Sequence, residues 1–343
     1  MSQATNPVGH NNVTFEVDIA WGHRHLDPTK TPVKNCHEMV VDRDNQIYMF
    51  GDHTANNVLV YDTNGKLIRT FGCEYPGGHG IDLASENGEQ FLFLVDPGDT
   101  GRNARGYRES GRVVKTTLYG EVVFTIGHPI TLGLYEPGQE YRPTEVAIAP
   151  NGDIYVADGY GSNNILHYDS RGRFIRMFGG PTDPNPDARL LNAHGVCLDT
   201  RNPEAPVLVC TSRTDNQFKT FSLDGQHLRT IDLPGAYVCR AVIDGPLLYA
   251  GVCWSKENGT GDRLDNSGFI TILDQDFRVI SNPFGSEPLY RDGKLTPLTQ
   301  APGATETWPI YHGHGVCLDH NGDLYLAQWN ANHTYPIKLT RRG

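Results

Sequence analysis

The sequence of 343 residues lacks the features that mark membrane and nucleic-acid-binding proteins. No 18 apolar residues run together, and residues 1–20 show no basic start followed by a continuous apolar stretch, so we expect neither a transmembrane helix nor an export signal. No run rich in lysine and arginine interrupts the net charge of −11, which would repel a phosphate backbone. We therefore expect a soluble cytoplasmic protein without nucleic-acid or membrane partners.

Sustained helical periodicity is also missing. Instead, 38 glycines and 22 prolines punctuate short apolar runs, a composition typical of β structure. The cysteines number seven, and Cys197 and Cys317 lie within apolar strand patterns, where a thiol behaves as a small hydrophobic group. An odd number of cysteines in such positions favours a reducing compartment.

What the sequence does contain is a recurring unit of four short strands joined by tight turns. The two clearest copies begin at His37 and Glu145 and follow the same order of strands and turns. Their turns carry residue pairs that readily supply the positive φ angles of hairpins, namely Asp44-Asn45, Asn64-Gly65, Asn151-Gly152 and Arg171-Gly172. Each unit therefore predicts one four-stranded meander.

Six such units align by their first strands, which predicts an all-β, six-bladed β-propeller occupying residues 1–343 as a single domain. The approximate blades are residues 37–72, 79–127, 145–180, 194–232, 239–284 and 314–340. The last unit ends before a fourth strand, whereas residues 13–22 alternate like one. We expect this N-terminal strand to close the ring in the last blade, leaving no long unpaired edge.

Two long gaps between unit starts indicate inserted loops. They comprise residues 97–112 with 129–142, and residues 254–266 with 283–310, all rich in glycine, proline and charge. Such insertions are expected to cover one mouth of the central channel.

The segment GDIYVADGYGSNNILHYDSRGRFIRMFG resembles the NHL repeat, and the resemblance covers most of the chain from His37 onward. Within that class the sequence resembles the peptidyl-α-hydroxyglycine α-amidating lyases, six-bladed NHL propellers with an axial zinc held by three histidines. The resemblance implies metal ligands in blades two, four and six. They are His79 in GGHGIDL, His194 in NAHGVCLD and His314 in HGHGVCLD.

The same resemblance implies two catalytic residues, Tyr160 in the Asp-Gly-Tyr segment and Arg213 in SRTDNQ. A phenol becomes a general base once a nearby cation lowers its pKa, or it only hydrogen-bonds the substrate. The guanidinium of Arg213 suits a substrate carboxylate. The plainer alternatives are an exposed loop tyrosine and a surface arginine beside Asp215.

Three departures from the lyases leave the substrate open. Gly315 follows the last histidine where the lyases carry an aspartate, and the segment MFGDHTANN offers no counterpart to an expected arginine in blade one. Gly161 replaces a cysteine after Asp-Gly-Tyr. The resemblance therefore implies site chemistry more firmly than it implies a peptide substrate.

Three histidine nitrogens leave a fourth position of zinc open, which is the catalytic pattern. Iron, manganese and copper also accept imidazole, so the expected cofactor is a divalent transition metal, with zinc favoured and a structural calcium deeper in the channel as a second candidate. The alternative is that these histidines only line a wet channel.

Other polar residues open the odd-numbered blades in the predicted register. His37, Glu145 and Arg240 are expected to contact substrate, although Glu145 and Arg240 would otherwise pair with each other. His37 is also a candidate fourth ligand or part of the channel lining, and His312 is a reserve ligand on a loop entering the last blade.

The leading functional hypothesis is a metal-dependent lyase that cleaves a C–N or C–O bond at a hydroxylated carbon of a small substrate, which Arg213 would suit if it is carboxylated. One alternative is a non-catalytic NHL-type module that binds a partner protein. A propeller hydrolase or lactonase, or a sugar-modifying enzyme, is another. The sequence does not predict the oligomeric state.

Overall fold

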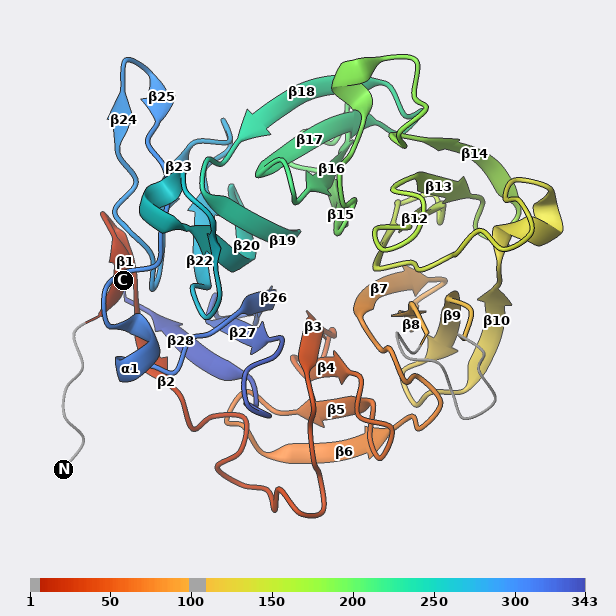
Figure 1. The fold of residues 1–343 in the computed structure, drawn as a ribbon. Coiled ribbons are helices and arrows are strands. Elements are labelled where there is room, and N and C mark those ends of the chain that lie inside the picture. Colours follow the sequence, from red (N-terminus) through yellow and green to blue (C-terminus); the bar gives the residue numbers. More distant parts are fainter. Residues whose placement is uncertain (1–6, 99–108, 343) are drawn as a thin grey trace.

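Six antiparallel sheets surround a central axis as the blades of a propeller (Figure 1). The computed structural model describes residues 7–98 and 109–342. In each blade, the strand that opens the unit lies nearest the axis, and the later strands lie progressively further out (Figure 1). The predicted all-β, six-bladed propeller is confirmed. Most of the inserted segment 97–112 lies outside the described residues.

The first three blades are regular four-stranded meanders. Blade one consists of β3 (Cys36–Val41), β4 (Ile47–Gly51), β5 (Val58–Tyr61) and β6 (Leu67–Phe71). Blade two consists of β7 (Gly80–Glu86), β8 (Glu89–Asp96), β9 (Arg112–Thr117) and β10 (Val122–Ile126). Blade three consists of β11 (Glu145–Ile148), β12 (Ile154–Ala157), β13 (Ile165–Tyr168) and β14 (Phe174–Phe178).

The last three blades follow the same plan with additions. Blade four consists of β15 (Val196–Asp199), β16 (Val207–Ser212), β17 (Gln217–Ser222) and β18 (His227–Asp232). Blade five consists of β19 (Ala236–Asp244), β20 (Leu247–Lys256), β22 (Phe269–Leu273) and β23 (Val279–Ser281), with β21 (Arg263–Leu264) paired to β20. Blade six begins with β26 (Gly313–Leu318), β27 (Leu324–Gln328) and β28 (Ile337–Arg341).

The hairpin turns form where the sequence supplies residues that tolerate a left-handed backbone. Asn45 has a φ of 62° between β3 and β4, and Gly152 has a φ of 85° between β11 and β12. Glycine has no Cβ to oppose this conformation, and asparagine adopts it more readily than most residues. These turns fix the register in which each inner strand pairs with its neighbour.

N-terminal strands complete the last blade, as the sequence predicts. β2 (Val13–Asp18) pairs with β28, where Val17 lies opposite Leu339, and the Phe15 side chain is fully buried. β1 (Val8–His10), which the sequence did not predict, adds a fifth strand outside β2. The Ser281 hydroxyl accepts a hydrogen bond from the His10 amide and donates one to the Val13 carbonyl, each at 2.8 Å. The closing strands are thus also tied to blade five.

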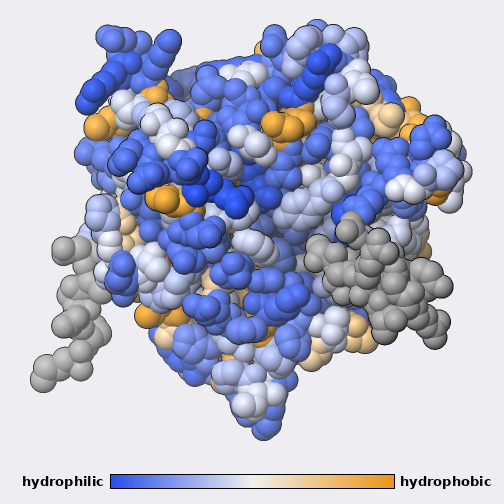
Figure 2. Space-filling model, viewed as in Figure 1, coloured by the Kyte–Doolittle hydropathy of each residue, from blue (hydrophilic) through white to orange (hydrophobic). Residues whose placement is uncertain are grey.

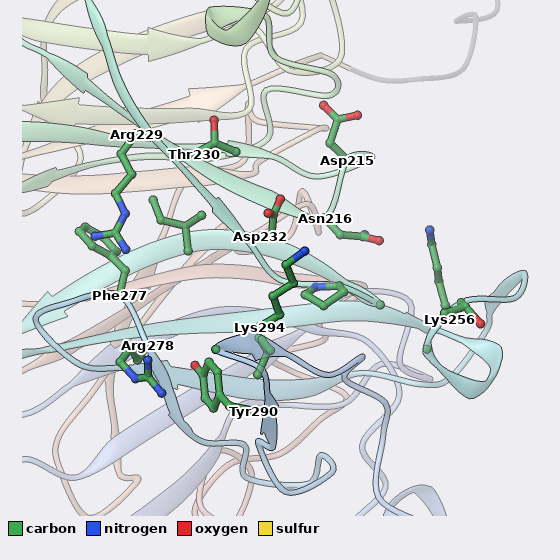
Figure 3. Close-up of a pocket in the computed structure, with 17 residues that line it drawn as sticks. Asp215, Asn216, Arg229, Thr230, Asp232, Lys256, Phe277, Arg278, Tyr290 and Lys294 are labelled. Carbon is green, nitrogen blue, oxygen red and sulfur yellow. The ribbon is translucent and has the colours of Figure 1, made fainter.

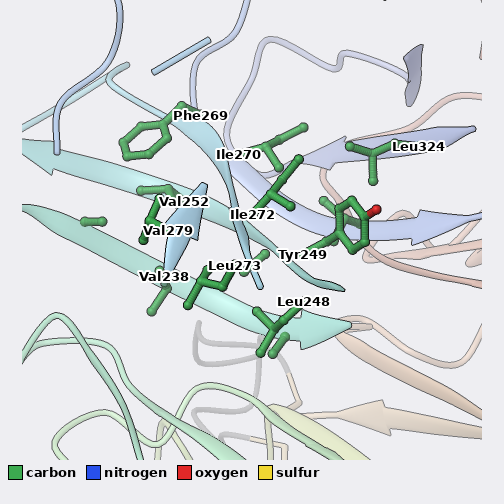
Figure 4. Packing of buried hydrophobic residues seen from close by; sticks show 14 of the residues in the cluster. Val238, Leu248, Tyr249, Val252, Phe269, Ile270, Ile272, Leu273, Val279 and Leu324 are labelled. Carbon is green, nitrogen blue, oxygen red and sulfur yellow. The ribbon is translucent and has the colours of Figure 1, made fainter. Parts of the chain in front are cut away.

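The hydrophobic core lies between neighbouring blades rather than at the axis. Figure 4 shows this packing at blade five, where Tyr249 and Ile272 approach Leu324 of β27 in blade six. All three side chains are fully buried. Because each blade buries both faces against its neighbours, the axis is left for polar residues.

Helical structure is confined to short segments among the described residues. They are α1 (Ala304–Thr307) and three single 3-10 turns, Pro129–Leu132, Pro186–Ala188 and Glu257–Gly259. No helix in the described ranges has the length and apolar character required to cross a bilayer.

The hairpin of β24 (Tyr290–Arg291) and β25 (Lys294–Leu295) extends from the outer edge of the ring rather than over the channel (Figure 1). The face shown in Figure 2 is mainly hydrophilic, with scattered hydrophobic residues.

Candidate metal centre

The six inner strands bring two layers of side chains to the axis. One position of the inner strand is equivalent in all six blades, because it pairs in the same way with the second strand of its blade. The residues at this position are Met39, Ile81, Val146, Val196, Ala241 and Val316. The residue two places earlier in each blade belongs to what we call the upper layer, which consists of His37, His79, Thr144, His194, Cys239 and His314. The residue one place earlier belongs to the lower layer, which consists of Glu38, Gly80, Glu145, Gly195, Arg240 and Gly315.

The three histidines predicted as metal ligands lie together at the axis. The ring centre of His79 is 4.8 Å from those of His194 and His314, and the latter two are 4.9 Å apart. With metal–nitrogen bonds of about 2.0–2.1 Å, three imidazoles in tetrahedral positions place their ring centres roughly 5 Å apart. The observed triangle therefore has the size that a metal ion requires.

Backbone carbonyls orient two of these imidazoles. Nδ1 of His79 lies 2.7 Å from the Thr144 carbonyl, and Nδ1 of His314 lies 2.9 Å from the His37 carbonyl. Each Nδ1 therefore carries the proton, and Nε2 is free to act as a ligand, an arrangement common around metal-binding histidines. Nε2 of His314 is buried and has no hydrogen-bond partner among the described residues. A metal would satisfy this nitrogen.

Electrostatics favour the neutral imidazoles that metal binding needs. Burial lowers the pKa of His79 and His194 well below the ordinary value, and neighbouring histidines and Arg213 lower it further. Burial also lowers the pKa of His314. Because only the neutral ring offers a lone pair, this environment preserves the ligand form at neutral pH.

Tyr160 meets the histidine cluster directly. It lies on the turn after β12, and its hydroxyl is 3.2 Å from Nε2 of both His79 and His194. The phenol thus contacts the nitrogens that would face a metal. Burial raises the pKa of Tyr160, and the Arg213 guanidinium opposes this rise. Tyr160 lies on a loop and is 37% exposed, as the plainer alternative has it, but its hydroxyl also makes these two contacts with the histidines.

Arg213 follows β16, and its side chain contacts two aromatic rings, those of Tyr160 and Trp254. Its guanidinium is 5.8 Å from the Tyr160 ring centre and 5.1 Å from that of Trp254. Asn192, which the sequence interpretation missed, accepts a hydrogen bond from Nε of Arg213 at 2.7 Å and donates one to Gly159 beside Tyr160. Arg213 is 7% exposed and is therefore a positioned cation rather than a free surface arginine.

His37 lies close enough to join the cluster. Its ring centre is 4.5 Å from that of His79 and 5.0 Å from that of His314. In the segment MFGDHTANN, Asp52 brings a carboxylate oxygen to 3.9 Å from Nε2 of His37. This contact opposes the lowering of the His37 pKa by burial. Substrate contact and metal ligation both remain predictions for His37.

Glu145 and Arg240 lie in the lower layer, below the histidines. Arg240 donates to the Asp82 carboxylate at 2.8 Å and to the Ile81 carbonyl at 2.9 Å. Glu145 is fully buried, and one of its carboxyl oxygens has no partner among the described residues. Their predicted contact with substrate stays untested, and their positions favour a structural role. The ion pair of Arg240 is with Asp82, and Glu145 affects Arg240 only through the charge that it places nearby.

The lower layer does not fit a calcium ion. Burial raises the pKa of Glu38 to about 8 and that of Glu145 well above its ordinary value, so both favour the protonated form. Burial disfavours the charge of Arg240, yet Asp82, Glu145 and Glu38 hold the Arg240 pKa above its usual range. Calcium needs six to eight oxygen ligands, and here a guanidinium already occupies the acidic layer. We therefore assign no calcium to it.

A glycine after each ligand histidine makes room for this lower layer. A Cβ at Gly80 would lie 2.5 Å from a Glu145 carboxyl oxygen, and one at Gly195 would lie 2.7 Å from Cα of Arg240. A Cβ at Gly315 would lie 2.6 Å from Cα of Glu38 and would collide with the His37 carbonyl. A histidine followed by glycine therefore indicates, in the sequence, that a lower-layer residue of the next blade lies against the glycine. Beside Gly315 that residue is Glu38.

Replacing Gly315 with alanine is expected to lower the free energy of unfolding by about 1–3 kcal/mol, because the added methyl overpacks the channel. The displaced strand should also weaken metal binding at His314. Gly127→Ala is the control, since a Cβ there meets no atom within 4 Å. Urea denaturation with and without metal measures both effects, and equal stability of the two variants would contradict the proposed crowding.

The stability of the metal-free protein is expected to be greatest near pH 6.5. Burial lowers the pKa of His37, His79, His194 and His314, so below about pH 6.5 the unfolded chain takes up protons that the folded protein does not. Each histidine then removes up to about 1.4 kcal/mol per pH unit until its folded pKa is reached.

The lower-layer carboxyls act in the opposite direction. Burial raises the pKa of Glu38 and Glu145, so their stabilising contribution is complete below about pH 4.5 and is lost as pH rises, for Glu38 up to about pH 8. Below pH 6.5 the four histidines outweigh the two carboxyls. Denaturation in chelator at pH 5.5, 6.5 and 7.5 measures the balance, and a stability that climbs from pH 6.5 to 5.5 would refute it.

Two compact sets of candidate ligand atoms occur among the described residues, and each combines two histidines of the predicted triad with one further residue. Ligand atoms of His37, His79 and His314 lie within 4.8 Å of one another, and so do those of His194, Cys239 and His314. Cys239 was missed because the sequence interpretation opened blade five at Arg240, one residue later. His312 is turned to other partners, since Nε2 accepts from the Asn266 amide and Nδ1 lies 3.2 Å from the Asn330 carbonyl.

A separate groove of about 700 Å³ runs between blades four and five toward the β24–β25 hairpin (Figure 3). Arg229, Arg278 and Lys294 lie along it, together with Asp232 and the Tyr290 ring. The buried histidines that carry the candidate chemistry are not among its lining residues. The candidate metal centre is therefore marked by buried polar groups rather than by a large cavity.

Comparison with known proteins supports the resemblance seen in the sequence. No protein-family model matches the chain. It is 30% identical over 202 residues to a probable peptidyl-alpha-hydroxyglycine alpha-amidating lyase of Caenorhabditis elegans, covering 54% of this chain and 51% of that protein. It is also 30% identical over 192 residues to human NHL repeat-containing protein 3, covering 55% and 52%. The chain thus spans about half the length of the curated relatives it matches.

Solved structures share the propeller fold at low sequence identity. A streptogramin B lyase structure has a TM-score of 0.53 and 14% identity, covering 99% of this chain and 100% of that one. A protein of unknown function from Bacteroides thetaiotaomicron has a TM-score of 0.55 and 12% identity, covering 91% and 70%. At these identities the likeness shows the fold alone.

Proposed function

We propose that this six-bladed propeller is a metal-dependent lyase that cleaves a C–N or C–O bond at a hydroxylated carbon of a small carboxylated substrate. The observation that carries the proposal is the position of the Tyr160 hydroxyl, 3.2 Å from Nε2 of His79 and of His194. A proton-transfer group and two candidate metal ligands thus converge on one point. The partial identity with an amidating lyase supports the same chemistry.

The histidines His79, His194 and His314 would hold a divalent transition metal, most favourably zinc. When bound, such a metal supplies Lewis-acid polarisation of the substrate hydroxyl. The remaining steps belong to side chains of this chain. Burial raises the pKa of Tyr160, so additional positive charge beside that of Arg213 is needed before the phenol ionises.

The ionised Tyr160 accepts the proton of the substrate hydroxyl. The electron pair of that O–H bond forms a carbonyl, the C–N or C–O bond breaks, and the departing nitrogen or oxygen takes the proton from Tyr160. The products are a carbonyl compound and an amide, amine or alcohol, with no oxidant or water consumed. Arg213 would hold the substrate carboxylate so that the reacting carbon lies beside the phenol.

Trp254→Ala is expected to raise KM about 2- to 30-fold with little change in kcat, because the indole supports Arg213 through a contact worth roughly 0.5–2 kcal/mol. Trp254 is itself held by Trp329, whose ring centre is 5.6 Å away. Steady-state kinetics of the variant, with Trp254→Phe as the ring-preserving control, measure the effect. An unchanged KM in the alanine variant would contradict this role for the indole.

The test of the proposed function is a screen of the metal-loaded protein with N-acyl α-hydroxyglycines and other α-hydroxylated carboxylic acids. A carbonyl-trapping reagent detects the expected aldehyde or keto product. Activity that requires metal, His194 and Tyr160 supports the lyase. A metal-loaded protein that releases no carbonyl from any of these classes argues against it.

A non-catalytic binding module is the second candidate, and the similarity to human NHL repeat-containing protein 3 favours it. Such a module has no need of Tyr160 at the histidine cluster. It would bind a partner protein equally well before and after metal removal. The lyase hypothesis accounts for the buried, unpartnered Nε2 of His314, which the binding-module hypothesis leaves unexplained.

A further inference from the structure

We propose that the metal centre of this chain has a sulfur ligand, the Cys239 thiolate, beside His194 and His314. The inference rests on the metal site of the proposed function and extends it. Cys239 is the upper-layer residue of blade five, the place that the sequence interpretation had given to Arg240. Its burial is complete, and His194 and His314 are each 1% exposed.

Cys239 lies at a β-bulge of the inner strand of blade five, and the inner strand of blade six has the same irregularity at His314. Val238 pairs with Val252 and Ala241 with Ala250, so Cys239 and Arg240 together lie opposite the single residue Gly251. A bulge of this kind redirects the side chains of the strand that carries the extra residue. Here the cysteine joins the histidines while Arg240 joins the lower layer. Gly251 is needed because a Cβ there would collide with the backbone of His314.

The ligand atoms of Cys239, His194 and His314 all lie within 4.8 Å of one another. Nε2 of His314 and Nδ1 of His194 are buried and have no hydrogen-bond partner among the described residues. The Cys239 thiol donates to the Gly313 carbonyl at the long distance of 3.8 Å. An ion would therefore give Nε2 of His314 a partner and bind the Cys239 sulfur in place of this long hydrogen bond.

The equivalent residue of blade three shows what a non-ligand looks like in the same layer. Thr144 donates its hydroxyl toward the Ala157 and Ala193 carbonyls, at 3.2 and 3.3 Å. Its oxygen is thus committed to the backbone. Cys239 has the softer atom and the weaker hydrogen bond, which is the combination expected of a ligand.

A thiolate changes what the metal does. Thiolates select zinc, cobalt or iron over manganese and magnesium, because the soft sulfur binds these ions more strongly. The negative sulfur also reduces the net charge of the centre. Cys239 would hold the ion together with the histidines, and the bound ion would still supply Lewis-acid polarisation of the substrate hydroxyl.

The test is the absorption spectrum of the protein reconstituted with Co²⁺ alone. Wild type is expected to show an intense near-ultraviolet thiolate-to-cobalt band, and Cys239→Ser to lose it while keeping the visible bands of bound cobalt. Cys253→Ser is the matched control, because the Cys253 thiol lies within hydrogen-bond reach of Cys239. This control is expected to keep the near-ultraviolet band.

Each outcome separates the two hypotheses. Wild-type protein that binds cobalt without the near-ultraviolet band overturns the Cys239 ligand and leaves the metal lyase standing. Protein that binds no cobalt overturns both. If Cys239→Ser does not fold, metal-edge X-ray absorption of wild type decides, since a sulfur ligand gives a scatterer at about 2.3 Å from zinc. A fit with nitrogen and oxygen ligands alone refutes the inference.

Discussion

Replacing His194 with alanine is expected to reduce the bound transition metal from near one per chain to a trace. Structural zinc sites with four ligands bind with about 10–16 kcal/mol, so one ligand accounts for roughly 3–4 kcal/mol and its loss weakens affinity about 100- to 1000-fold. His194 is one corner of the histidine triangle, with its ring centre 4.8 Å from that of His79 and 4.9 Å from that of His314.

Elemental analysis of dialysed protein for zinc, iron, manganese, copper and calcium measures this effect. His320→Ala is the control, because His320 is exposed on the turn between β26 and β27. The control should retain the wild-type metal content. A His194→Ala protein that holds as much metal as wild type would show that the ion lies elsewhere, and calcium as the main element would contradict the reading of the lower layer.

Replacing Tyr160 with phenylalanine is expected to lower kcat by about 10²- to 10⁴-fold, the usual contribution of a positioned general acid–base group. Only the hydroxyl is removed, so the ring and its cation–π contact with Arg213 remain, whereas the hydrogen bond between the hydroxyl and Arg213 is lost. The metal content should not change, because Tyr160 lies beside the ligand nitrogens and its contacts with them, at 3.2 Å, are hydrogen bonds.

The comparison needs paired assays of turnover and metal content on the same protein preparation. Tyr119→Phe is a suitable control, since 76% of Tyr119 is exposed and it lies in the turn between β9 and β10. A Tyr160→Phe enzyme whose kcat stays within threefold of wild type would exclude the phenol from proton transfer. A variant that loses its metal would make Tyr160 a positioning residue of the centre.

Most of the fold was predictable because its rules are local. Asn45 and Gly152 have the left-handed backbone expected from their turn sequences, and the alternation in residues 13–22 identified the closing strand. β1 was missed because Val8–His10 is too short to show an alternating pattern. Its position depends on Ser281 of blade five, a contact between distant parts of the chain.

The site was predictable only in the blades where the aligned position in the sequence is also the equivalent position in the structure. His79, His194 and His314 could be found because each is a histidine that opens an inner strand, the motif of the lyases that the sequence resembles. Cys239 could not, because blades three and five have no histidine at this position and the alignment took the charged residue that follows, Glu145 or Arg240, as the start of the strand. Both of these residues therefore lie in the lower layer rather than in line with the histidines.

The central claim of this account is that His79, His194 and His314 hold a transition metal beside Tyr160. The most direct measurement is anomalous X-ray diffraction from crystals of the metal-loaded protein, collected on both sides of the absorption edge of the metal. The account predicts one strong peak on the propeller axis within bonding distance of all three imidazoles. A peak elsewhere, or no axial peak in crystals grown with excess metal, would contradict it.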